Sequence, residues 1–124
     1  MSNPIFTDAT LEGVHLEVTI AEDASLSESI DLKHYALIGV LMPSGWTDSL
    51  TFQVGFSING TIQYFDVYDN DGNEIVAVGG SSRFVRIYPT ELPAVKYLKV
   101  RTGTSGTPIA QGSNKTITLL IREV

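Results

Sequence analysis

The chain has 124 residues, the length of one ordinary domain, and its 43% hydrophobic and 18% charged residues exclude intrinsic disorder. It has no cysteine, which excludes disulfides, thiolate metal sites and a cysteine nucleophile. The formal net charge of −6 argues against nucleic acid as a partner. We predict a single domain over residues 1–124, with a loose N-terminal lead over residues 1–10.

The beginning of the chain has no recognisable targeting signal. Residues 1–18 lack the basic start and the long apolar core of a signal peptide, and no later segment is long and apolar enough to span a membrane. We therefore expect synthesis in a cytoplasm, without a signal peptide and without a membrane partner.

Charge is unevenly distributed between the two halves. Residues 1–61 hold eight acidic residues and one basic residue, a net charge of −7, whereas residues 62–124 hold six acidic and seven basic residues, a net charge of +1. Two interpretations stay open. The halves attract each other, within one chain or between subunits, or the asymmetry is ordinary surface charge.

Apolar and polar residues alternate along most of the chain, as they do in half-buried β-strands. The first strands are predicted over residues 14–20 and, more weakly, over residues 26–32. Residues 35–42 (YALIGVLM) are almost continuously apolar, which predicts a short strand buried on both sides.

The segment 50–68 predicts a β-hairpin. Two alternating runs flank Asn59-Gly60, a dipeptide typical of a two-residue type I′ turn. The turn would pair Ile58 with Thr61, Val54 with Phe65 and Phe56 with Gln63. Cross-strand partners share a face, so one face is predicted to be core, with Phe52, Val54, Phe56, Phe65 and Val67. The opposite face would carry Thr51, Gln53, Gly55, Ser57, Ile62, Tyr64, Asp66 and Tyr68.

Shorter strands are predicted over residues 74–78, 83–88, 96–102 and 116–122, separated by turn clusters. The strand at 83–88 has apolar residues on both faces, which indicates an edge position or a face covered by another subunit. In the strand at 96–102, Leu98 and Val100 face one way and Tyr97, Lys99 and Arg101 the other. Residues 90–95 allow at most one helical turn. About eight to nine strands predict an all-β antiparallel sandwich or jelly roll.

Two groups of residues have side chains that could carry chemistry. The run Asp69–Glu74 has clustered oxygen ligands, but it lacks the spacing of a calcium loop, so an acidic hairpin turn is the better interpretation. His15 and His34 have no nearby ligand or catalytic partner in the sequence. We expect no metal, no cofactor and no enzymatic activity.

Three aromatic residues are candidates for contact with a partner or a glycan. Trp46 follows the turn at 43–45; it either plugs the end of the sandwich or offers a surface for stacking. Tyr64 and Tyr68 lie on the non-core face of the predicted hairpin. They either contact a partner or pack beneath a second layer formed by a loop or by the N-terminal lead.

Basic residues gather on the two strands at 83–88 and 96–102. Arg86 and Lys99 are the next candidates for partner contact. Basic side chains on an edge strand also prevent aggregation, which is the alternative interpretation for some of them.

The order of motifs over residues 28–102 resembles galactose-binding-like jelly rolls of the discoidin type. The resemblance consists of an apolar strand, Trp46, the hairpin with Asn59-Gly60, and the late strand VKYLKV. It implies the same fold and a capacity for sugar binding. This chain lacks the disulfide cysteines of that family and has a loop-rich segment at 103–113, and no sugar-ligating residue carries across.

A second resemblance spans almost the whole chain. The segments DLKHYALIGVLMPSGWTDSLTFQV, SSRFVRIYPTEL and VKYLKVRTGTSGTPIAQGSNKTITLLIRE are similar to small virion structural proteins of tailed bacteriophages. This resemblance implies a capsid-associated, decoration, fibre or head–tail component.

We therefore expect a non-catalytic virion structural protein, made in the host cytoplasm. It would act by binding other virion proteins of the capsid or connector, as a homo-oligomer. The alternative is a carbohydrate-binding module that recognises a host glycan.

Overall fold

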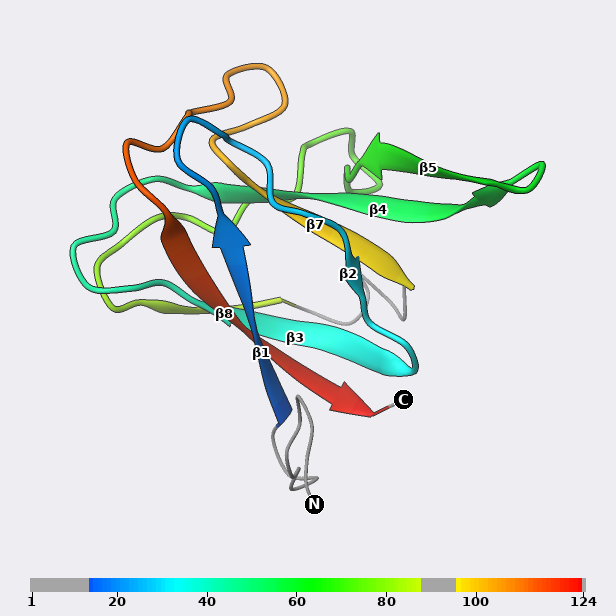
Figure 1. Ribbon diagram of the computed structural model, residues 1–124, viewed down its shortest axis with the longest axis horizontal. Helices are drawn as coiled ribbons and strands as arrows, with labels where there is room; N and C mark the ends of the chain where they lie inside the picture. The colour runs from blue at the N-terminus through cyan, green and yellow to red at the C-terminus, as the bar shows by residue number, and fades with distance from the viewer. Residues whose placement is uncertain (1–13, 88–95, 124) are drawn as a thin grey trace.

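The computed structural model describes residues 14–87 and 96–123, which form two antiparallel four-stranded sheets packed face to face (Figure 1). The first sheet has the order β1-β8-β3-β6, and its strands are β1 (Val14–Ile20), β8 (Lys115–Glu123), β3 (Tyr35–Leu41) and β6 (Phe84–Arg86). The second sheet has the order β2-β7-β4-β5, and its strands are β2 (Ile30–Asp31), β7 (Tyr97–Thr102), β4 (Leu50–Ile58) and β5 (Thr61–Asp66). The predicted all-β antiparallel sandwich is confirmed for this part of the chain.

The chain winds between the sheets in a regular way. Strand β1 pairs with β8, β2 with β7, β3 with β6 and β4 with β5, all antiparallel. A long hairpin of paired strands wrapped around a core produces this order, which is that of an eight-stranded jelly roll. No helix in the described ranges is long and apolar enough to cross a membrane. The lead expected over residues 1–10 and the turn expected over residues 90–95 lie outside the described residues.

Of the predicted strands, one is absent from the structure and another is reduced to two residues. Residues 74–78 form no strand and contact their neighbours through isolated bridges, Tyr68 to Glu74 and Leu50 to Ala77. Residues 26–32 keep only β2 and a single bridge from Leu26 to Arg101. Both segments still contribute buried side chains, among them Ile75, Ala77 and Leu32.

The core lies between the two sheets and follows the alternation of the strands. The inward-facing side chains with at most 1% exposure come from both sheets and from the loops that close them: Ile20, Leu32, Leu37, Val40, Met42, Leu50, Phe52, Ala77, Leu98, Val100, Ile117, Leu119 and Ile121. The prediction that Leu98 and Val100 share one face is therefore confirmed, and that face is the inward one.

The register of the β4–β5 hairpin is confirmed. Val54 pairs with Phe65, and Ile58 pairs with Thr61. Asn59 and Gly60 have φ angles of 53° and 85°, as a type I′ turn requires. Positive φ is strained for most residues, and Asn and Gly tolerate it best.

The predicted core face of this hairpin is only partly buried. Phe52 is fully buried, but Phe56 and Phe65 are 48% and 40% exposed, with their rings stacked 5.4 Å apart. Pairing of β4 with β7 ends at Gly55, so the tip of the hairpin extends beyond the rest of its sheet (Figure 1). The expectation that Phe56 and Phe65 are core residues is wrong for that reason.

The expectation that residues 35–42 are buried on both sides is confirmed except at Ile38, which is half-buried, and at Leu41. The inward side chains Leu37 and Val40 are fully buried, but Leu41 is 42% exposed on the outer face. Next to β3, the short strand β6 lies at the edge of the first sheet, as one interpretation of its mixed pattern predicted. Its Phe84 is 49% exposed on the same outer face as Leu41.

Candidate binding surface

Three of the five candidate contact residues lie on the outer face of the second sheet. Tyr64 on β5 and Lys99 on β7 point away from the core, and Tyr68 follows the end of β5. Tyr68 is 53% exposed, while Tyr64 and Lys99 are half-buried. Successive residues of a strand point to opposite faces of the sheet, so these side chains lie on the other face from Val54, Phe65 and Val100.

Tyr64 lies flat across its sheet. Its ring covers Gly55, where an added Cβ would be 2.6 Å from Cε1 of the tyrosine. The Nζ of Lys99 is 4.3 Å from the ring centroid, which is the distance of a cation–π contact. The hydroxyl of Tyr64 shares a hydrogen bond with the Ser29 hydroxyl, next to β2. One side chain therefore connects all four strands, and its ring is held in place before any partner binds.

The neighbouring Tyr97 has a similar environment. The Nζ of Lys96 is 5.2 Å from its ring centroid, and the same ammonium is 3.4 Å from a carboxylate oxygen of Asp31. The hydrogen bond from the backbone N–H of Lys33 is the main cause of the lowered pKa of Asp31; burial opposes it, and Lys96 lowers the pKa further. The outer face thus combines two tyrosine rings with two lysines that lie over them.

A buried ion network lies at the other end of this face. The guanidinium of Arg101, whose side chain is 7% exposed, hydrogen-bonds Asp66 and lies 3.2 Å from Glu74. Arg101 also donates to the Thr51 hydroxyl, 3.3 Å away. The hydrogen bond from Arg101 holds the pKa of Asp66 below its usual value, with a further contribution from Gln53. The alternation of residues 96–102 correctly placed Arg101 on the face opposite Leu98 and Val100, but it did not predict that the Arg101 side chain is buried.

Tyr68 lies beside this network. Its hydroxyl is 3.2 Å from the Ser105 hydroxyl, and Ser105 in turn donates to Glu74 through its backbone N–H and its hydroxyl, 3.1 and 3.2 Å away. The exposed ring of Tyr68 is therefore anchored at its hydroxyl end by a polar cluster. No sequence pattern predicted that the loop containing Ser105 reaches this face.

Trp46 is a core residue. It is 5% exposed, and its indole N–H donates to the backbone carbonyl of Asp48. Its backbone N–H bonds the carbonyl of Pro43, which closes the turn that directs the ring inward. The expectation that Trp46 offers a stacking surface is corrected, because the ring plugs the end of the sandwich instead.

Arg86 lies on β6 in the first sheet, so the structure does not bring it together with Tyr64, Tyr68 and Lys99. It pairs with Gly39 of β3, and its side chain is exposed on the outer face of that sheet. The five candidates therefore divide among one core position and two opposite faces of the molecule.

The acidic run at 69–74 forms a turn closed by its own groups. One carboxylate oxygen of Asp69 accepts the backbone N–H groups of Asp71 and Asn73, each at 2.9 Å. Gly72 has a φ angle of 86°, which a glycine adopts without strain. Within residues 14–87 and 96–123, no group of three or more histidines and carboxylates is arranged to hold a metal ion.

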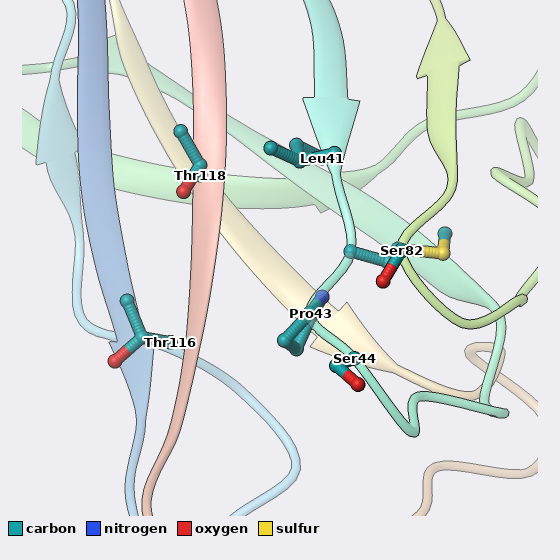
Figure 2. Close-up of a pocket in the computed structure, with 7 residues that line it drawn as sticks. Leu41, Pro43, Ser44, Ser82, Thr116 and Thr118 are labelled. Atoms are coloured by element: carbon teal, nitrogen blue, oxygen red, sulfur yellow. The ribbon is translucent and has the colours of Figure 1, made fainter.

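The sequence did not predict an apolar surface on the outer face of the first sheet. Its exposed side chains are Leu41 and Phe84, with Leu120 of β8 half-buried between the strands. A hollow of about 420 Å³ lies between β1 and Phe84; it is lined by His15, Glu17, Leu41, Phe84, Thr118 and Leu120. Toward the loops the surface becomes polar, where Thr116 and Thr118 lie across from Leu41, Pro43, Ser44 and Ser82 (Figure 2). The mixed pattern of residues 83–88 and the almost continuous apolar run of residues 35–42 were the sequence signals for this surface.

Comparisons of the chain with protein-family models, with curated proteins and with solved structures found no match.

Proposed function

We propose that this chain is a non-catalytic structural protein of a bacteriophage virion that acts by binding other virion proteins. The observation that carries the binding part of the proposal is the outer face of the second sheet, where Tyr64, Tyr97 and Lys99 are held by contacts within the sheet. Tyrosine is enriched at binding hot spots because it supplies a large apolar area together with a hydroxyl group.

The mechanism is recognition by a preformed surface. The ring of Tyr64 is fixed by Ser29 and Lys99, so a partner would not have to immobilise it on binding. Immobilising a mobile side chain at an interface costs about 0.5–1.5 kcal/mol, and a fixed ring avoids that cost. Individually weak contacts suffice on a particle that repeats them many times.

The virion assignment rests on the resemblance of the sequence to small tailed-phage structural proteins. The jelly-roll winding is compatible with it, since eight-stranded jelly rolls are found in viral capsid and lectin domains. Compatibility of fold is an analogy and does not by itself assign a function. The proposed position is capsid-associated, as a decoration or head protein, and the proposed domain type is galactose-binding-like.

Incorporation into assembled particles tests the proposal. We expect the double variant Tyr64→Ala/Tyr68→Ala to fold, as judged by circular dichroism, but to co-purify with particles at a greatly reduced level. The matched control is Ile109→Ala, which removes a comparably exposed apolar side chain, 39% exposed, from a loop. Full incorporation of the tyrosine variant would contradict the proposed binding face, and a gene position far from capsid and tail genes would contradict the virion assignment.

Binding to a host glycan is the second candidate function. With Trp46 in the core, the candidate for stacking against a sugar is Tyr68, whose side chain is 53% exposed and next to the polar groups of Ser105 and Glu74. A glycan array probed with the purified chain separates the two functions. A hit that is lost in Tyr68→Ala favours carbohydrate recognition, and an array without a hit favours protein contact.

A further inference from the structure

The outer face of the first sheet has the composition of an interface. Leu41 is 42% exposed and Phe84 is 49% exposed, and they occupy directly paired positions on β3 and β6. Leu120 and Ile38 flank them and are half-buried. A contiguous apolar surface rimmed by polar residues is typical of a site of protein contact.

Strand β3 supports this view from its own sequence. Its run YALIGVL is apolar on both faces, a pattern typical of strands that have a packed layer on each side. In the single chain, only the side with Leu37 and Val40 faces the core. On the other side, Ala36 and Gly39 are already buried within the chain and Ile38 is half-buried, so Leu41 is the position of β3 that a second layer would still cover.

The shape of this face is complementary to itself. The ring of Phe84 lies over Gly39, where an added Cβ would be 2.2 Å from its Cζ, so the ring forms a ridge across β3. Beside it is the hollow of about 420 Å³ between Phe84 and β1. Because one face carries both this ridge and a hollow, two copies related by a two-fold axis can each place Phe84 in the hollow of the other.

Residues of opposite charge lie at the two edges of this face, where a second copy related by a two-fold axis can bring them together. Glu17 lies on β1 at one edge of the sheet, and Arg86 lies on β6 at the opposite edge. A two-fold axis parallel to the strands places β1 of one copy above β6 of the other. Glu17 shares its row across the sheet with Phe84, and Arg86 is two residues further along β6. In that arrangement Glu17 of each copy therefore lies diagonally across from Arg86 of its neighbour, and opposite charges steer the two faces together.

We infer that the outer face of the first sheet is a self-association surface, and that its occupant is a second copy of this chain. The inference goes beyond the proposed function and does not depend on it, because it concerns the opposite side of the sandwich. A dimer formed in this way leaves both faces with Tyr64 directed outward and free for other partners. Few of its large apolar side chains are substantially exposed, chiefly Leu41 and Phe84, so we expect a weak dimer, with a dissociation constant on the order of 100 µM.

Sedimentation velocity on the full chain, from about 1 µM to about 1 mM, tests the inference. We expect a concentration-dependent dimer whose dissociation constant rises about tenfold or more in Phe84→Glu, because the variant places a charge in the hollow of the partner. The matched control is Ile62→Glu, which introduces the same charge at a side chain 38% exposed on the second sheet and leaves dimerisation unchanged. A wild-type chain that stays monomeric throughout, or a Phe84→Glu variant that dimerises normally, overturns the inference.

A charge exchange tests the arrangement of the two copies. Glu17→Arg and Arg86→Glu should each weaken the dimer, since each brings like charges together across the interface. The double variant should recover most of the wild-type association, because the pair is restored with its signs reversed. Thermal unfolding of each variant, measured in parallel, reports whether the monomer remains folded. A double variant that associates no better than the single variants overturns the two-fold arrangement.

Discussion

The guanidinium of Arg101 lies 3.2 Å from the carboxylate of Glu74, and both side chains are nearly buried, with 7% and 11% exposure. Glu74 reaches this position from the turn that follows β5, and Arg101 reaches it from β7. Removing one member of a buried ion pair leaves a desolvated charge without its partner, which costs more than the pair contributes to stability. The network therefore fastens the turn at 69–74 to the second sheet.

We predict that Arg101→Met lowers the free energy of unfolding by about 3 kcal/mol, because Glu74 and Asp66 lose their shared cation. Urea denaturation followed by circular dichroism measures this loss. Lys99→Met is the matched control, since Lys99 lies on the same strand and face but makes a half-exposed contact with Tyr64. Its loss should be at most about 1 kcal/mol. Similar losses in the two variants would contradict the structural role of the network.

The pH dependence of stability should report Asp66. Because Arg101 and Gln53 lower its pKa in the folded chain below the ordinary value of 3.8, the unfolded chain takes up the proton first as the pH falls. The stabilisation from Asp66 is therefore fully present above that value and is lost as the pH falls through the lower folded pKa. We predict that Asp66→Asn is less stable than the wild type at about pH 7 and that the difference shrinks below about pH 4.

Comparing the stability of Asp66→Asn with that of the wild type isolates the contribution of Asp66. Asp31 also has a lowered pKa, but it is present in both chains and its contribution cancels in the difference. Denaturant titrations of both proteins at a series of pH values give the measurement. A stability difference that stays constant from neutral pH to acid would contradict the assignment of the ion pair to Asp66.

The turn of the β4–β5 hairpin gives a third prediction. Gly60 has a φ angle of 85°, and nothing lies within 4 Å of the position of an added Cβ. The cost of Gly60→Ala is therefore one of backbone conformation alone, about 1 kcal/mol. Gly112→Ala is the control, since that position is equally open and its φ is not in the left-handed region. If the two variants unfold at the same denaturant concentration, the turn is not the type I′ turn described.

Local sequence signals were sufficient for the register of the hairpin and for the direction of side chains on β7. Asn59-Gly60 determines which residues pair, and alternation determines which face each residue occupies. Neither signal reports how much of a face is covered. Phe56 is exposed because β4 extends past β7, and Arg101 is buried because two carboxylates distant in sequence fold over it.

The candidate site was predictable to the same extent. Tyr64 and Tyr68 were expected on the non-core face of the hairpin, and they lie there. The anchoring of Tyr64 by Ser29 joins residues 35 positions apart, which no local pattern encodes. The position of Trp46 depends on which loop closes the end of the sandwich, so a single tryptophan after a turn was compatible with either role.

Among the loop glycines whose φ angle other residues can also adopt, Gly79 should be the one whose replacement by alanine lowers stability most. An added Cβ would be 2.3 Å from the carbonyl oxygen of Thr47 and 2.4 Å from that of Asp48. Both obstacles are backbone atoms, so no side-chain rotation relieves the clash, and the two segments would have to separate. We predict that Gly79→Ala lowers the free energy of unfolding by about 2–3 kcal/mol, the typical cost of overpacking.

Gly106→Ala is the control for this prediction, because nothing lies within 4 Å of its added Cβ. It should change the free energy of unfolding by no more than about 0.5 kcal/mol, as surface substitutions usually do. Denaturant unfolding of the two variants next to the wild type provides the measurement. Because Gly79 also donates its backbone N–H to the Ser49 hydroxyl, 3.2 Å away, separation of the segments should weaken that contact as well. A Gly79→Ala variant as stable as Gly106→Ala would mean that the loop at 79 does not pack against residues 47 and 48 as described.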